Sequence, residues 1–205
     1  MSRLELARWA LSMTIPALAG FLGVLVGAWL TSKREERQRR FAFLERQLRD
    51  FYSPLIGLRS EIRKKSELRL RISSAANTEW QRLCEQMRNT ARPEENLERL
   101  QKEKGPQFDA IINYNNEQFA KDILPAYRQM LAVFRDNLWL ADPETRPHFD
   151  NLLEFVDLWE RWVARSIPHE VIKYLGHTEE TLHPFYDHLE KKLDELRLRL
   201  SEGRA

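Results

Sequence analysis

The sequence predicts an all-α protein in which an N-terminal transmembrane helix continues into a stalk and a cytoplasmic helical bundle. Three observations indicate this class. No charged side chain lies between Arg8 and Lys33; only three of the seven glycines, Gly57, Gly105 and Gly176, lie in the body that follows; and apolar residues there recur at alternating spacings of three and four. The 205-residue chain is long enough for one domain with its own core after the span.

The first element is a transmembrane helix over residues 9–32, preceded by a short N-terminus of residues 1–8. A helix of about 20 apolar residues crosses the hydrocarbon core, and Trp9 and Trp29 stand near its ends, where indole rings favour the interface. A secretory signal has an apolar region of only about 7 to 15 residues followed by a cleavage site of small residues. The longer run here, without such a site, favours an uncleaved anchor.

The charges on either side of the span predict its orientation. Only Arg3 and Arg8 precede it, whereas a basic cluster follows it, and lysine and arginine favour the cytoplasmic side. The body should therefore be cytoplasmic and the N-terminus outside, which also agrees with a single cysteine, Cys84. Near a leaflet of anionic lipids each basic side chain contributes about 1 kcal/mol to membrane binding. The basic residues expected at the membrane surface are Lys33, Arg34, Arg37, Arg39 and Arg40.

Small residues recur every four positions within the span, at Ala19, Gly23 and Gly27. Such a face allows two membrane helices to approach closely, so it predicts packing between two copies. Glycine is also common in membrane helices that only anchor a protein, and both interpretations remain open.

A basic stalk helix is expected over residues 33–53, followed by a helical bundle over residues 54–202. Within "DFYSPL", Tyr52, Ser53 and Pro54 predict a kink or a restart, because Ser53 can cap a helix and proline suits its first turn. A heptad seam runs through this region, at Phe41, Leu44, Leu48, Phe51, Leu55, Leu58 and Ile62. A second seam runs through the last helix, at Leu182, Tyr186, Leu189, Leu193, Leu196 and Leu200. The two seams could pair within one chain or between two chains.

The middle of the chain predicts further helices. The charged segment over residues 92–106 is expected to be an exposed helix or a connector that ends at Gly105 and Pro106, and Pro125 is expected to begin a new helix. The segment over residues 149–165 has the widest apolar arc, which predicts the central helix of the bundle.

An asparagine-rich segment, "INYNNEQF", interrupts an otherwise helical pattern. Asn115 or Asn116 must fall close to the apolar seam, and a buried amide without hydrogen bonds costs about 1 to 3 kcal/mol. Two interpretations follow: a structural amide network, or a polar pocket for a ligand. The candidate pocket residues are Asn113, Tyr114, Asn115, Asn116 and Glu117.

No motif for catalysis or for a cofactor stands out. The usual phosphate-binding, hydrolase and metal signatures are missing, and Glu180 with His183 forms only half of a di-iron motif. We therefore expect no catalytic residue, no metal and no cofactor, and place His177, His183 and His188 at the surface or at helix caps. A net charge of only +2 and the lack of a binding module argue against nucleic acid.

Three stretches carry a resemblance to known sequences: "LRDFYSPLIGLRSEIRKKSELRLRIS", "YNNEQF" and "HPFYDHLE". In these the chain resembles a group of uncharacterised bacterial proteins with one N-terminal span and an F-Y-x-P-L motif in the stalk. The resemblance implies a single-pass protein of the bacterial inner membrane with a helical body, and no particular activity.

The function expected from the sequence is binding: a membrane-anchored helical interaction or scaffold protein with a protein partner or a second copy of itself. The alternative is a membrane-tethered ligand sensor or enzyme with its pocket around Asn113 to Glu117.

Overall fold

The computed structural model describes residues 27–203, and within this range the protein is helical without a single β-strand, which confirms the all-α class. Among these residues no helix is both long and apolar enough to cross a membrane. The predicted span, residues 9–32, lies mostly outside the described residues, and so do Ala19 and Gly23.

Backbone contacts divide the described residues into two compact units. The smaller unit comprises the helix over residues 27–46 and the residues from Leu196 onward, and the larger unit comprises Gln47–Glu195.

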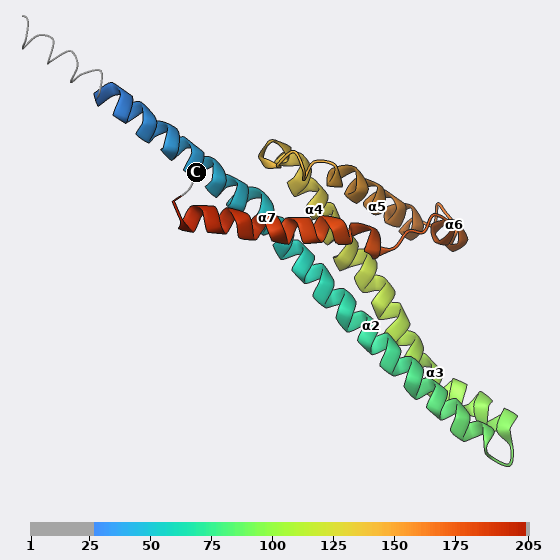
Figure 1. The fold of residues 1–205 in the computed structure, drawn as a ribbon. Helices are drawn as coiled ribbons and strands as arrows, with labels where there is room; N and C mark the ends of the chain where they lie inside the picture. Colours follow the sequence, from blue (N-terminus) through green and yellow to red (C-terminus); the bar gives the residue numbers. More distant parts are fainter. Residues whose placement is uncertain (1–26, 204–205) are drawn as a thin grey trace, which may run out of the picture. The chain divides into compact units, whose positions relative to one another are not determined.

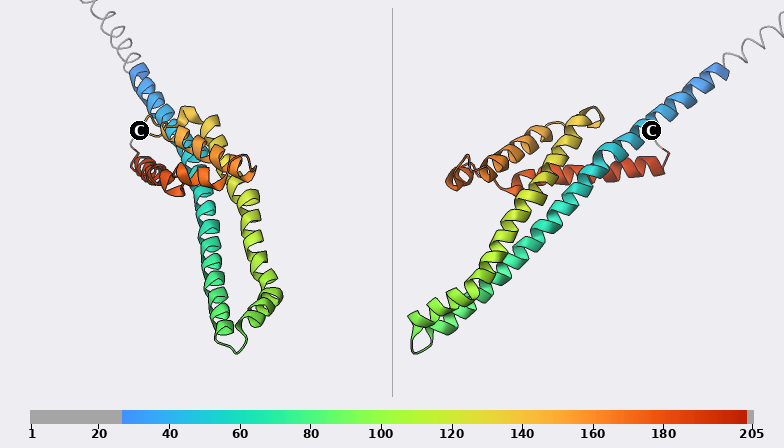
Figure 2. Two further views of the ribbon diagram at one scale, coloured as in Figure 1. Left: turned by 90° about the vertical axis from the view of Figure 1, so that its right-hand side faces the viewer. Right: turned by 180° about the vertical axis from the view of Figure 1, so that it is seen from behind.

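The larger unit is built on a helical hairpin. Its first limb is the π-helical turn η1 (Gln47–Tyr52) and α2 (Ser53–Arg88). Its second limb returns through α3 (Pro93–Gln118), a second π-helical turn η2 (Phe119–Ile123) and α4 (Leu124–Asp136). Figures 1 and 2 show α2 and α3 side by side in every view, running in opposite directions.

Five shorter elements complete the chain after this hairpin. They are η3 (Leu138–Leu140), α5 (His148–Val163), α6 (His169–Tyr174), η4 (Glu179–Leu182) and α7 (His183–Ser201). The core of the larger unit lies where α2, α4, α5 and α7 meet. Its buried side chains include Phe51, Leu55, Ile62, Leu124, Met130, Phe134, Leu152, Phe155, Leu182, Phe185 and Leu189.

Two prolines follow the two π-helical turns directly. Pro54 is in the first turn of α2 after η1, and Pro125 is in the first turn of α4 after η2. Proline lacks an N–H and its ring clashes with the carbonyl four residues before it. The extra residue in a π-helical turn widens the helix at that carbonyl, so the chain stays helical on both sides of each proline. The predicted restart with Ser53 as a cap is therefore wrong, because Tyr52 is itself helical and no side chain caps α2.

Gly105 and Pro106 do not end a helix. Both lie inside α3, which continues to Gln118, so the predicted stop at this pair is wrong. Gly105 is buried against the Gln101 side chain. Packing of α3 along α2 stabilises the helix through a proline that an isolated helix would not tolerate, because proline there costs about 3 kcal/mol.

The segment predicted as the central helix is peripheral. In α5 only Leu152, Phe155 and Val156 are buried, while Leu153 and Val163 are exposed. Its wide apolar arc therefore does not reflect contacts on every side. The central positions belong to α2 and α4, which contact each other along the hairpin.

The parts of the two heptad seams that belong to the larger unit, Gln47–Glu195, meet within one chain. The guanidinium of Arg59 on α2 lies over the ring of Tyr186 on α7, 4.5 Å from its centroid, and also pairs with Glu190. Leu55 and Leu189, one from each seam, are fully buried. Pairing inside the chain is thus the alternative that the structure supports.

Candidate binding groove

The distal part of the hairpin is an arm of only two helices, formed by α2 beyond Ser73 and by the part of α3 that packs along it. No residue of α2 beyond Ile62 is buried. The two helices contact each other through the rings of Trp80 and Phe108, whose centroids lie 5.0 Å apart. An element that packs on one side only leaves the flanks of its seam open to solvent.

The first hollow of this seam, which we call the distal hollow, has a volume of about 230 Å³. Its aromatic floor is formed by Trp80 and Phe108, and amide and carboxylate groups stand at its rim. The lining residues are Ser73, Ala76, Asn77 and Trp80 from α2, and Gln101, Gly105, Phe108, Asp109, Ile111 and Ile112 from α3.

A second hollow, the proximal hollow, lies nearer the core and also measures about 230 Å³. Four elements of the fold contribute side chains to it. These are Arg69, Leu70 and Ser73 from α2; Ile112, Asn115, Asn116 and Phe119 from α3 and η2; and Trp159 and Trp162 from α5. Because Ser73 and Ile112 line both hollows, the two form one continuous groove along the seam.

The asparagine-rich segment divides between the hollow and the solvent. Asn115 is buried and donates a hydrogen bond from Nδ2 to Ser73 Oγ at 2.9 Å, as the amide-network interpretation expects. Asn116 is exposed and lines the proximal hollow. Asn113, Tyr114 and Glu117 are exposed and line neither hollow, so of the predicted pocket residues these two hollows contain only Asn115 and Asn116. Glu117 instead hydrogen-bonds Lys121, which lowers the pKa of its carboxyl.

Arg69 is the cation of the proximal hollow. Its guanidinium lies over the ring of Phe119 at 5.2 Å from the centroid, and burial lowers the pKa of this half-buried group. In the described part of the chain no carboxylate pairs with it, although the charge of Glu179 acts on it from a distance. Arg69 has no signal in the sequence that marks it as a site residue, because only the fold brings it to the indoles of α5, about ninety positions later.

An aromatic cluster closes the proximal hollow. The Phe119 ring lies 4.7 Å from Trp159 and 6.1 Å from Trp162, and the two indoles stand nearly perpendicular at 5.3 Å. Behind them His177 packs on Phe155 and Trp159, and its buried Nε2 has no hydrogen-bond partner. Burial lowers the pKa of the His177 imidazole, which is only partly exposed.

Tyr52 anchors a polar network at the base of the hairpin. Its hydroxyl is fully buried and shares a hydrogen bond of 2.9 Å with Thr145, which in turn contacts His188 Nε2 at 2.8 Å. The backbone N–H of Asp142 also donates to the Tyr52 hydroxyl. Burial, more than any charge, raises the pKa of this tyrosine. Tyr52 thus joins η1 to the loop before α5 and to α7, where His188 is partly buried.

Tyr127 and Tyr186 form a hydrogen-bonded pair in the same unit. Tyr127 donates to Glu179 at 2.9 Å, and Tyr186 donates to the Tyr127 hydroxyl at 3.3 Å. Burial raises the pKa of both phenols, so both stay protonated at neutral pH and serve as donors. The Glu179 carboxylate is thus held by Tyr127.

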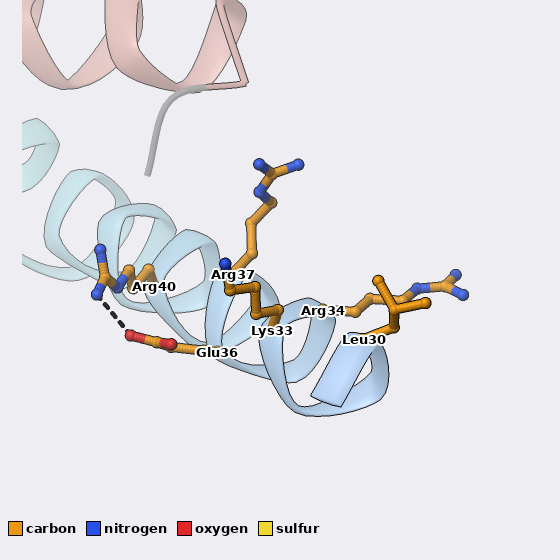
Figure 3. A pocket seen from close by; sticks show the side chains of 6 residues that line it. All are labelled: Leu30, Lys33, Arg34, Glu36, Arg37 and Arg40. Carbon is orange, nitrogen blue, oxygen red and sulfur yellow. Dashed lines mark hydrogen bonds and ion pairs between the residues drawn. The ribbon is translucent and has the colours of Figure 1, made fainter. Parts of the chain in front are cut away.

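In the smaller unit, basic side chains lie along one face of the helix over residues 27–46. Figure 3 shows Lys33, Arg34, Arg37 and Arg40 extending from this helix, with Arg40 paired to Glu36. These four side chains line a hollow on this helix together with Leu30 and Glu36, and Arg39 does not line it. Lys33 lies over the Trp29 ring at 4.2 Å, and a Cβ added at Gly27 would meet no other atom within 4 Å.

No cluster of three or more histidine, cysteine or acidic side chains suited to a metal ion occurs among residues 27–203. Glu180 and His183 do not belong to such a cluster, and the His183 ring instead lies 6.5 Å from that of Tyr186.

Comparison with known proteins provides no family for this chain. No protein-family model, no curated protein and no solved structure matches it. The function must therefore be argued from the groove itself.

Proposed function

We propose that this protein is a membrane-tethered interaction protein whose arm binds a helix of a partner protein in the distal hollow. The observation that carries the proposal is the open seam of a two-helix arm, with Trp80 and Phe108 at the floor of the hollow. An α-helix packs on two others at interaxial distances of about 8 to 10 Å and inserts side chains every three or four residues into the groove between them.

The composition of the distal hollow fits a protein partner. Protein interfaces have an apolar centre and a polar rim. Here Trp80, Phe108 and Ile112 form the centre, and Asn77 and Asp109 stand at the rim. Leu70, which is more than a third exposed and lies within about 20° of Asn77 around α2, would extend the contact.

A tether to the inner membrane is the second part of the proposal, with residues 9–32 as a single span and the body in the cytoplasm. The uncharged run between Arg8 and Lys33 supports it. The exposed basic face at Lys33, Arg34, Arg37 and Arg40 would contact anionic lipids, and Trp29 beside Lys33 suits the interface. Alkaline phosphatase fused after residue 205 would stay inactive in this topology. An active fusion would show that the body lies outside the cytoplasm.

Photo-crosslinking in intact cells tests the partner. A photoreactive amino acid replaces Asn77 at the rim of the distal hollow and, as the matched control, Glu79, which lies about 200° around the same helix. We expect one discrete protein adduct from position 77 and none from position 79. An adduct between two copies of this chain would make the occupant a second copy, and equal adducts at both positions would refute a specific groove.

A further inference from the structure

We infer that the proximal hollow is a binding site for a small carboxylate that carries one flat aromatic ring. The hollow combines the Arg69 guanidinium, an aromatic corner and the exposed amide of Asn116 in a volume of about 230 Å³. Arg69, Trp159 and Trp162 line this hollow and not the distal hollow to which the partner helix is assigned, so the two proposals can fail independently.

The anionic end follows from Arg69. A partly desolvated cation without a paired carboxylate is costly, and an anion placed beside it forms charge-assisted hydrogen bonds that recover this cost. Contact with the Phe119 ring holds the guanidinium in place before any ligand binds. A planar guanidinium and a planar carboxylate match through two parallel hydrogen bonds.

The charge of the ligand is limited to one. Arg69 is the only lysine or arginine among the residues that line this hollow, and the negative charge of Glu179 already acts on it. A dianionic phosphate would lack a second cation and would be repelled by that carboxylate. The local charge therefore favours a carboxylate over a phosphate.

The ring follows from the walls. Trp159 and Trp162 meet at an interplanar angle of 79°, which forms a corner with one indole face and one indole edge. Aromatic rings prefer edge-to-face and offset contacts of this kind. An apolar cavity of about 150 Å³ already holds benzene, so about 230 Å³ has room for one ring with its carboxylate.

The polar wall adds selectivity. The hydrogen bond from Asn115 fixes the Ser73 hydroxyl as an acceptor, so its own proton can be donated to a ligand. The Asn116 amide lines the same hollow and has no hydrogen-bond partner among the described residues. The Ser73 hydroxyl and the Asn116 amide can both donate to a carboxylate oxygen of the ligand.

Isothermal titration of the full-length protein in detergent micelles with benzoate tests the inference. Benzamide has the same shape without the charge, acetate has the charge without the ring, and phenyl phosphate has the ring with a second charge. We expect benzoate to bind at least about tenfold more tightly than each of these three. No heat with benzoate up to about 10 mM, or equal affinity for benzoate and benzamide, would overturn the site.

Two variants locate the binding. Arg69→Gln should weaken benzoate at least about tenfold, whereas Arg63→Gln, on the same helix and outside the hollow, should leave it unchanged. Asn116→Ala, at an exposed position, should weaken benzoate about threefold without changing the fold, and it decides the case if Arg69→Gln does not fold. If both Arg69→Gln and Asn116→Ala bind benzoate as tightly as the wild type, the binding site lies elsewhere. If Arg69→Gln does not fold, unchanged affinity in Asn116→Ala alone leads to the same conclusion.

Discussion

Phe134 should be the side chain on which the larger unit depends most, and Phe134→Ala is the substitution that tests its packing. The ring is fully buried on α4 and contacts three other phenylalanines. These are Phe51 of η1 at 5.1 Å, Phe149 of α5 at 5.3 Å and Phe185 of α7 at 5.7 Å. Removing it opens a cavity where four elements meet.

The expected loss follows from that burial. Replacing a fully buried phenylalanine by alanine costs about 3 to 5 kcal/mol, and a domain of this kind is stable by about 5 to 15 kcal/mol. Phe108→Ala on the arm provides the comparison, because that ring is only half-buried and has one aromatic partner, Trp80. For Phe108→Ala we expect a loss of about 1 to 2 kcal/mol.

Urea unfolding of the full-length protein in micelles, followed by far-ultraviolet circular dichroism, measures both losses. With a urea dependence of about 2 kcal/mol per molar, Phe134→Ala should lower the midpoint by about 2 M and Phe108→Ala by less than about 1 M. If the two variants lose the same stability, or if Phe108→Ala loses more, the core does not lie where α2, α4, α5 and α7 meet.

Four further predictions use the same unfolding assay. Tyr52→Phe and Thr145→Val should each cost about 1 kcal/mol, and the double variant should cost less than their sum because both remove one hydrogen bond; additive losses would contradict that bond. Burial, then the neighbouring histidine and lysine, lowers the pKa of His188. The unfolded chain therefore takes up the proton first, so stability should fall as pH drops below about 6.5, and His188→Asn should reduce this slope; an unchanged slope would contradict it. Pro106→Ala should stabilise the arm by about 1 to 3 kcal/mol because it restores a helical hydrogen bond, and a loss of stability would show that the proline is required. Gly105→Ala should gain about 0.5 to 1 kcal/mol, since its Cβ would meet only the end of a flexible glutamine side chain; a loss would mean that this side chain cannot move.

Apolar spacing predicted most of the helices because burial selects one face of each helix regardless of its partner. Leu55 and Ile62 on α2 and Leu189 on α7 lie in the core, as the two seams predicted. The same spacing cannot tell how many neighbours a helix has. The wide apolar arc of α5 therefore predicts a central helix, whereas α5 is peripheral and its Leu153 is exposed.

Local signals at prolines were misleading for a different reason. Pro54 and Pro106 both read as helix boundaries, since an isolated helix does not tolerate proline beyond its first turn. The helix continues through both prolines. A π-helical turn precedes Pro54, and at Pro106 the contact of α3 with α2 stabilises the helix. Tertiary contacts that outweigh a local preference leave no trace in the local sequence.

The proximal hollow could be predicted only in part. The poor helix propensity of "YNN" revealed Asn115 and Asn116, because amides near an apolar seam require partners. Arg69 is one of many arginines in a basic segment and looked like a surface charge. Its contact with Phe119 and its place beside Trp159 depend on how α5 folds back on the hairpin.

The central claim is that the arm binds a partner protein through the distal hollow, and quantitative pull-down of the full-length protein from membrane extracts tests it most directly. Asn77→Arg places a long charged side chain at the rim of the hollow, and Thr78→Arg, with the same change of charge one residue further on, lies outside the hollow. We predict that mass spectrometry finds one protein that is retained by the wild type and Thr78→Arg and lost at least about tenfold with Asn77→Arg. The same set of proteins in all three samples would contradict the claim.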